Sequence, residues 1–249
     1  MHFTTPFKHA LNVVVLFLSL LGLTLMMLFG SPWLALRSVF MPRAQRQAYV
    51  RRAITTGYRR YFGVLHFFHV FRLDASELDR LQGERGVILT ANHPTLFDAL
   101  LIISRLPNVV CIMKAQVLRN VMFGDGARMA GYIPNDSIRH IVSEAVRELE
   151  SGSQLLLFPE GTRSLQGRIH PFQGTVGLIA RHSCCPVQTI FIESDSGFLG
   201  KGWPFWKVPD FPIRICVRTG RRFVPGDNSK QFIAELQQYY AQELGRQVA

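Results

Sequence analysis

A histidine and an aspartate five positions apart are the residues of this chain best suited to acid–base chemistry. His93 and Asp98 stand in ANHPTLFDALL, between two apolar runs. On one straight helix they would point about 140° apart, at ~100° per residue, so they can pair only if His93 precedes the helix and the chain turns back. We expect Pro94 in the first turn of that helix, and Asp98 then orients the imidazole while its other nitrogen accepts a proton. The spacing also fits a turn histidine followed by a helix-capping aspartate.

A second polar stretch follows another buried-looking strand, in LLLFPEGTRS at residues 155–164. Its polar and small residues are Glu160, Gly161, Thr162 and Arg163. In open α/β sheets, ligands bind beyond the carboxyl ends of the strands. Gly161 would let the backbone approach a ligand, and Arg163 offers a planar fork for phosphate. The alternative is a salt bridge between Glu160 and Arg163 in an ordinary loop.

Strand-like and helix-like segments alternate along the rest of the chain. Strands are expected at 86–91, 108–113, 154–159, 186–194 and 211–220, and helices at 96–106, 136–152, 174–183 and 229–245. This alternation predicts an α/β fold with a largely parallel sheet flanked by helices. The connection between Ser194 and Phe211 is long, as functional loops often are, and we expect its Trp203, Phe205 and Trp206 to contact lipid.

The N-terminal region predicts two membrane-associated helices. The segment Leu11 to Phe29 is uncharged and, as a helix at ~1.5 Å per residue, would reach about 28 Å, close to the ~30 Å hydrocarbon core. It is too long for a signal peptide and no small-residue cleavage site ends it. We therefore expect an N-terminal hydrophobic membrane helix that Ser31–Pro32 interrupts. A second, interfacial helix is expected from Ala44 to Phe71, with packing on the soluble body as the alternative.

The charge distribution supports a membrane partner. The net charge is +11, and the first 73 residues hold nine Lys and Arg but no Asp or Glu. Because these charges flank the most apolar segment, they indicate an anionic membrane surface and not a nucleic acid. Arginines after the apolar segment should stay cytoplasmic, which predicts a catalytic domain on the cytoplasmic side of the inner (cytoplasmic) membrane. We expect a membrane-anchoring region at 1–73 and an α/β domain at 74–249, with four reduced, buried cysteines.

The two polar stretches together resemble the glycerolipid acyltransferase family, whose type member acylates 1-acylglycerol-3-phosphate (lysophosphatidate). The first family motif, N-H, four residues, D, matches Asn92 to Asp98, and the third, F-P-E-G-T-R-S, matches Phe158 to Ser164 in full. A weaker fourth motif resembles Pro186 to Ile190. The resemblance covers residues 87–192, and an N-terminal membrane segment is usual in the family.

The resemblance implies an O-acyltransferase of phospholipid metabolism. His93 would deprotonate a hydroxyl of a membrane lysolipid, whose oxygen attacks the thioester of an acyl-CoA or acyl-carrier protein, and Asp98 would orient His93. The implied substrate-binding residues are Asn92, Gly131, Ile133, Arg139, Glu160, Gly161, Thr162 and Arg163. No metal, covalent acyl-enzyme or cofactor beyond the thioester co-substrate is implied.

One family motif is altered. The second motif reads G-x-I, two residues, D-R, whereas this chain has GYIPNDS, with Ser137 in place of the arginine. Either Arg139 substitutes for it, or the acceptor lacks the phosphate that this arginine contacts. The alternatives are a phosphate-free acceptor, such as a lyso-ornithine or aryl-polyene lipid, and a non-catalytic lipid-binding protein on the same fold. Since the chain has no G-x-S-x-G elbow, it does not match a serine hydrolase on an α/β fold.

Overall fold

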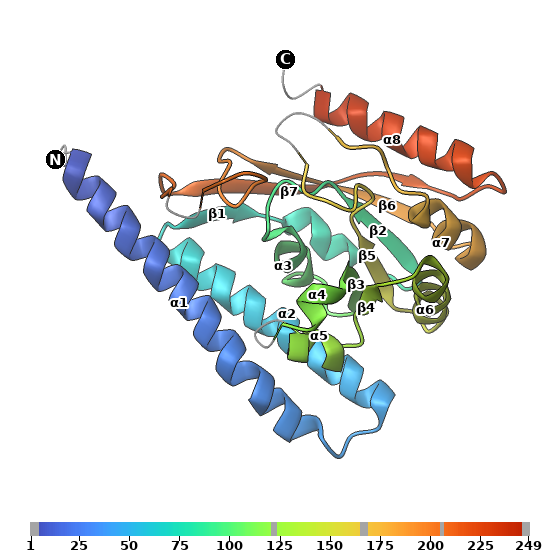
Figure 1. The fold of residues 1–249 in the computed structure, drawn as a ribbon, viewed down its shortest axis with the longest axis horizontal. Coiled ribbons are helices and arrows are strands. Elements are labelled where there is room, and N and C mark those ends of the chain that lie inside the picture. The colour runs from blue at the N-terminus through green and yellow to red at the C-terminus, as the bar shows by residue number, and fades with distance from the viewer. Residues whose placement is uncertain (1–4, 121–123, 165–168, 205–206, 246–249) are drawn as a thin grey trace.

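A seven-stranded sheet with helices on both faces forms the body of the protein (Figure 1). The structure is a computed structural model that describes residues 5–120, 124–164, 169–204 and 207–245. The strand order is β1-β7-β6-β2-β5-β3-β4. The strands are β1 (Phe71–Asp74), β2 (Val87–Ala91), β3 (Val109–Lys114), β4 (Ile133–Asn135), β5 (Gln154–Leu157), β6 (Val187–Ser194) and β7 (Ile213–Phe223).

The helices divide between the two faces of the sheet. They are α1 (Thr5–Ser38), α2 (Arg43–Phe67), the 3₁₀ helix η1 (Ser76–Leu81), α3 (Asp98–Ile103), α4 (Ala115–Leu118), α5 (Gly124–Met129), α6 (Ile138–Glu150), α7 (Thr175–Ser183) and α8 (Ser229–Gly245). Figure 1 shows α8 across one face, while α3 and the long pair α1 and α2 lie on the other. The expected α/β architecture is confirmed.

Five neighbouring strands end at one edge of the sheet. The parallel strands are β6, β2, β5, β3 and β4. β7 is antiparallel to β6, and β1 pairs with β7 in parallel. Thr90 pairs with Leu157 and Cys111 with Leu156, so the register brings His93 level with Glu160, and Lys114 level with Pro159. The two polar stretches found in the sequence therefore meet at the carboxyl edge.

Several local predictions were wrong. Pro32 does not interrupt α1, which continues to Ser38 and packs against α2 and α5. Packing of the helix offsets the backbone hydrogen bond that the proline removes. The second helix ends at Phe67, before His69 adopts a positive φ of 56°, and residues up to Asp74 form β1 instead. Pro94 is not in the first turn of α3, which begins at Asp98. The division of the chain after residue 73 stays a prediction.

The predicted burial of all four cysteines was also wrong. Cys111 is buried, whereas Cys184 and Cys216 are exposed and Cys185 is half-buried. All four are free thiols.

α1 presents an apolar surface that indicates membrane association. It is long and apolar enough to cross a membrane, and only 11% of its most apolar 18-residue window is buried. The large apolar side chains exposed on it are Phe7, Leu11, Val13, Val14, Phe17, Leu18, Leu20, Leu21, Leu25, Leu28, Phe29, Trp33 and Leu36. A surface of this size is not left to water in a soluble protein.

α2 has both surfaces that the sequence suggested. Val50, Phe62 and Leu65 are buried in the core, whereas Arg52 and Phe67 are exposed. Packing on the body thus occupies one face, and basic and aromatic residues remain on the surface, as suits a membrane interface.

A buried arginine fastens α2 to the sheet. Arg51 donates from Nε to the Ala130 carbonyl at 2.7 Å, from Nη1 to Ser153 Oγ at 2.9 Å and from Nη2 to Glu148 Oε2 at 3.0 Å. The Arg51 and Glu148 side chains are only 5% and 10% exposed. One side chain therefore joins α2, the turn before β4, α6 and the start of β5.

Removing this arginine should destabilise the fold. Arg51→Ala leaves the Glu148 carboxylate buried without its cation, which typically costs about 3–5 kcal/mol. The neighbouring Arg52 is exposed, so Arg52→Ala is the matched control. Thermal unfolding of both variants in detergent should show a large decrease in Tm for Arg51→Ala alone. Equal Tm values would contradict a stabilising role for the buried arginine.

Candidate functional site

The structure brings His93 and Asp98 together at the carboxyl end of β2. His93 lies in the turn before α3, and its Nδ1 is 2.7 Å from Oδ2 of Asp98, the first residue of α3. Thr95 donates to the same carboxylate twice, from its backbone N–H to Oδ2 at 2.7 Å and from Oγ1 to Oδ1 at 2.6 Å. Thr95 was not singled out in the sequence, although its position inside the first motif is the signal that could have found it.

The environment of the two side chains differs strongly. The Asp98 side chain is fully buried, whereas the His93 side chain is 20% exposed. Burial raises the pKa of the Asp98 carboxyl, and the hydrogen bonds from His93 and Thr95 act in the opposite direction. Because both carboxylate oxygens accept hydrogen bonds, Nδ1 of His93 is assigned as the proton donor, which leaves Nε2 as the basic atom of the ring.

Residues of the third motif hold His93 from a neighbouring turn. The Phe158 ring stacks on the imidazole with the ring centroids 4.1 Å apart and an interplanar angle of 20°. Ser164 exchanges two hydrogen bonds with His93, because its N–H donates to the His93 carbonyl at 2.8 Å and its Oγ accepts from the His93 N–H at 3.2 Å. The turns after β2 and β5 are thus fixed to each other.

Glu160 and Arg163 both bind other parts of the chain. Glu160 is buried, and its carboxylate accepts from Ser164 Oγ and from the His170 N–H at 2.9 Å. Arg163 donates from Nη1 to the carbonyls of Leu199 and Gly200, at 2.8 and 3.0 Å. No ion pair joins Glu160 to Arg163 among the described residues, so the salt bridge suggested as an alternative is not formed.

The two small residues between them shape the turn. Gly161 has a φ of +65°, and a Cβ there would lie 1.9 Å from Gln173 Nε2, so glycine is needed for a tight turn. Thr162 is half-buried. The Gln173 N–H also donates to the Pro159 carbonyl at 2.8 Å, which holds this turn in place.

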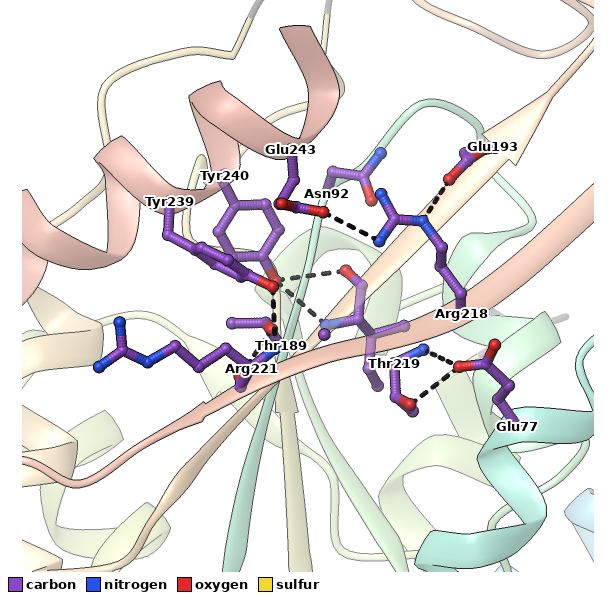
Figure 2. Close-up of polar contacts among 12 residues, drawn as sticks. Glu77, Asn92, Thr189, Glu193, Arg218, Thr219, Arg221, Tyr239, Tyr240 and Glu243 are labelled. Atoms are coloured by element: carbon purple, nitrogen blue, oxygen red, sulfur yellow. Dashed lines mark hydrogen bonds and ion pairs between the residues drawn. The ribbon is translucent and has the colours of Figure 1, made fainter. Parts of the chain in front are cut away.

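Asn92 fastens β2 to β6. Its Oδ1 accepts from the Ile192 N–H at 2.7 Å, and its Nδ2 donates to the Ile192 carbonyl at 2.9 Å. Figure 2 shows the Tyr240 side chain pointing from α8 toward the sheet. Its hydroxyl donates to the Thr90 carbonyl at 2.6 Å. Both contacts support the end of the strand that carries His93.

Figure 2 also shows Arg218 between the carboxylates of Glu193 and Glu243. The distances are 2.7 Å from Nε to Glu193 and 3.3 Å from Nη1 to Glu243. Because Glu243 lies on α8, this network joins α8 to β6 and β7.

The second motif lies further along the same edge. Gly131 has a φ of +74° and lies against Gln47 of α2, while the Ile133 side chain is buried in the core. Ser137 caps α6 by accepting from the His140 N–H, and Arg139 is exposed on the first turn of α6. In the described part of the chain, no hydrogen bond or ion pair joins any of these residues to His93 or Asp98.

A second histidine–aspartate pair occurs at the start of α6. His140 Nδ1 lies 3.0 Å from Asp136 Oδ1, but both side chains are exposed. The hydrogen bond from His140 lowers the pKa of Asp136, whereas burial raises that of Asp98. The shielded carboxylate distinguishes the His93 pair from this exposed one.

One cation at the edge was missed by the sequence analysis. Lys114 ends β3 with its side chain exposed, next to β5 in the sheet. A lysine that directly follows an apolar strand is the signal that could have found it. Among the described residues, no group of three or more His, Cys, Asp or Glu could hold a metal ion.

Comparison with known proteins places this site within a matched region. The family model described as Acyltransferase matches residues 72–193, which include both polar stretches. A 1-acyl-sn-glycerol-3-phosphate acyltransferase of Cocos nucifera is 31% identical over 107 residues, 40% of this chain and 35% of that protein. A lyso-ornithine lipid O-acyltransferase of Rhizobium meliloti (strain 1021) is 35% identical over 98 residues, 37% of this chain and 32% of that protein. The matched part thus spans about a third of each curated relative.

A solved structure shares the fold over nearly the whole chain. The crystal structure of the 1-acyl-sn-glycerophosphate (LPA) acyltransferase PlsC from Thermotoga maritima superposes with a TM-score of 0.75. It covers 97% of this chain and 98% of that one at 21% sequence identity. This similarity extends to α1 and α2, which lie outside the family model.

Proposed function

We propose that the chain is an enzyme of the acyltransferase family, whose model matches residues 72–193, and that it transfers a fatty acyl group from a thioester donor to a hydroxyl of a lysolipid. The observation that carries this proposal is the 2.7 Å contact between His93 Nδ1 and the fully buried Asp98. Among the described residues, no hydrogen bond occupies Nε2 of His93. A partly exposed imidazole with one nitrogen held and the other available is what a general base requires.

His93 would act through Nε2. It removes the proton of the acceptor hydroxyl as the oxygen attacks the thioester carbonyl, and Asp98 stabilises the imidazolium that forms. The carbon–sulfur bond then breaks, and the leaving thiolate takes the proton from His93. The products are an ester and a free thiol, and His93 returns to its starting state. Phe158 and Ser164 keep the ring in place throughout.

We favour 1-acylglycerol-3-phosphate as the acceptor because cations follow the three strands next to β2 along the carboxyl edge that also carries His93. Arg163 follows β5, Lys114 ends the adjacent β3, and Arg139 follows β4. Lys114 and Arg139 are exposed, and no carboxylate pairs with either in the described part of the chain. Both can therefore meet a headgroup phosphate. A lyso-ornithine lipid is the second candidate, because Ser137 replaces the motif arginine and a lyso-ornithine lipid O-acyltransferase is among the relatives that this chain resembles.

The contacts of α1 bear on how it meets the membrane. Near its start, Lys8 pairs with Asp210 at 3.2 Å and Asn12 donates to the Pro209 carbonyl at 3.3 Å. Near its end, α1 contacts α5. Both ends therefore touch the same body, whereas a helix crossing the bilayer would separate them by the ~30 Å core. We propose that α1 lies within one leaflet, with the catalytic domain on the cytoplasmic side.

Replacing the general base should remove activity without unfolding the protein. His93→Ala is expected to decrease kcat by about 10²–10⁴-fold, because general acid–base catalysis contributes about that much. Asp98→Asn should decrease kcat by a large part of the same factor, because the imidazole loses the carboxylate that orients it. The assay is thiol release from acyl-CoA with lysophosphatidate in detergent or vesicles. His182 is exposed on α7, so His182→Ala is the control. Near-normal kcat in a folded His93→Ala protein would refute the assignment.

The acceptor can be identified by removing charge at the edge. Losing a charge-assisted bond to phosphate costs about 1.5–3 kcal/mol, so Lys114→Ala and Arg139→Ala should each raise the KM for lysophosphatidate by about tenfold or more. The donor KM should not change, and Arg181→Ala on α7 is the control. Lyso-ornithine lipid is measured in parallel. Exclusive turnover of this phosphate-free acceptor would overturn the preferred substrate but leave the chemistry intact.

The orientation of α1 can be tested by labelling. If α1 lies in one leaflet, a cysteine at residue 2 and one at residue 40 should both react with an impermeant maleimide from the cytoplasmic side. Phe40, in the turn between α1 and α2, is 98% exposed and suits this substitution. Cys184, Cys185 and Cys216 are first changed to serine. Labelling of the two positions from opposite sides of the membrane would show that α1 spans it.

A further inference from the structure

Two basic side chains meet at the rim of the candidate site. Lys201 Nζ lies 3.3 Å from His170 Nε2. Lys201 is exposed and His170 is half-buried. In this contact the ammonium donates and the neutral imidazole accepts. No carboxylate pairs with either side chain among the described residues, so the positive charge is not neutralised within the protein.

Both residues are tied to the turns that hold His93. The His170 N–H donates to Glu160, whose carboxylate also accepts from Ser164 Oγ, and Ser164 bonds to His93. Lys201 follows Gly200, whose carbonyl accepts from Arg163 at 3.0 Å. The position of the basic pair relative to the candidate base is therefore fixed by the fold.

Gly200 also packs directly against the turn after His93. A Cβ on Gly200 would lie 3.4 Å from the Pro94 carbonyl oxygen. The loop that carries Lys201 thus lies over the turn of the first motif, and Lys201 is one residue beyond this contact. The basic pair is near the site but outside the contacts of the imidazole itself.

The proposed reaction involves two phosphates, one on the lysophosphatidate acceptor and one on the thioester donor, and the position of the basic pair favours the second. The phosphate of a lysophosphatidate is only a few bonds from the attacked hydroxyl, so it must lie next to His93. The phosphate of a thioester donor is separated from the sulfur by the pantetheine arm, and it must lie further out. A lysine and a histidine side by side can share one phosphate, since the ammonium and an imidazole N–H can each donate a hydrogen bond to the phosphate anion.

We propose that Lys201 and His170 form a subsite for the phosphate of the donor's phosphopantetheine arm. This inference rests on the proposed acyl-transfer function. Coenzyme A and an acyl-carrier protein share this phosphate, and the geometry favours neither. Arg163 has a positioning part in the subsite, because its bonds to the carbonyls of residues 199 and 200 hold the loop in place.

The test compares donors with and without the phosphate. Initial rates are measured for acyl-CoA, acyl-carrier protein and acyl-pantetheine, with the full-length protein and its Lys201→Ala and His170→Ala variants. The KM advantage of the phosphate-bearing donors over acyl-pantetheine should shrink about tenfold in each variant, since a charge-assisted bond is lost. The KM for the acceptor should not change. Lys230 is exposed at the start of α8, so Lys230→Ala controls for loss of a surface charge.

Each outcome decides the proposal. If the KM advantage over acyl-pantetheine shrinks for acyl-CoA alone or for acyl-carrier protein alone, the subsite is supported and the donor is identified. If the KM for acyl-pantetheine rises as much as that for the phosphate-bearing donors, or if only the acceptor KM changes, the subsite is overturned and the proposed acyltransferase activity stands. An unchanged donor preference in both variants overturns it as well. If the wild-type protein turns over no donor, the proposed function fails, and this inference fails with it.

Discussion

The burial of the Asp98 carboxylate is the constraint on which the arrangement of the site depends. A charge in the interior is tolerated only when hydrogen bonds replace the water it has lost, and here Thr95 and His93 supply them. The requirement fixes the turn after β2, because only a tight turn brings the Thr95 backbone and side chain to the same carboxylate. It also fixes the imidazole, whose Nδ1 must face inward. The orientation of His93 is thus a consequence of satisfying a buried charge.

This constraint reaches the rest of the molecule through hydrogen bonds between turns. Ser164 joins the His93 backbone to the turn after β5, and Glu160 extends that connection to His170. Asn92 joins the end of β2 to β6 through its two hydrogen bonds with the Ile192 backbone. The polar side chains of Asn92, Ser164 and Glu160 thus bind the backbone or one another, which leaves few of their groups free for a ligand. Much of what a motif specifies is therefore the shape of the edge.

The sequence predicted the elements with long periodic patterns and the pair at the centre of the site. β2 and α8 were found where expected, and His93 does lie outside the helix that Asp98 begins. The short strands β1 and β4 were missed, because three or four residues are too few to show alternation. The positions of Lys114 and Lys201 depend on strand register and on a loop folding back over the edge. Contacts of this kind join distant segments, and no local pattern records them.

The antiparallel course of β7 has a consequence for how this fold can change. Because β7 begins at the edge where β6 ends, the connection between Ser194 and Ile213 starts and finishes at the edge that carries the candidate site. Residues can be inserted, deleted or exchanged in such a connection while the strands keep their register. Asp210 and Gly200 lie on it, so the same segment touches both α1 and the turn of His93. A change in this one loop therefore alters the surroundings of the candidate site and leaves the strand pairing behind His93 unchanged.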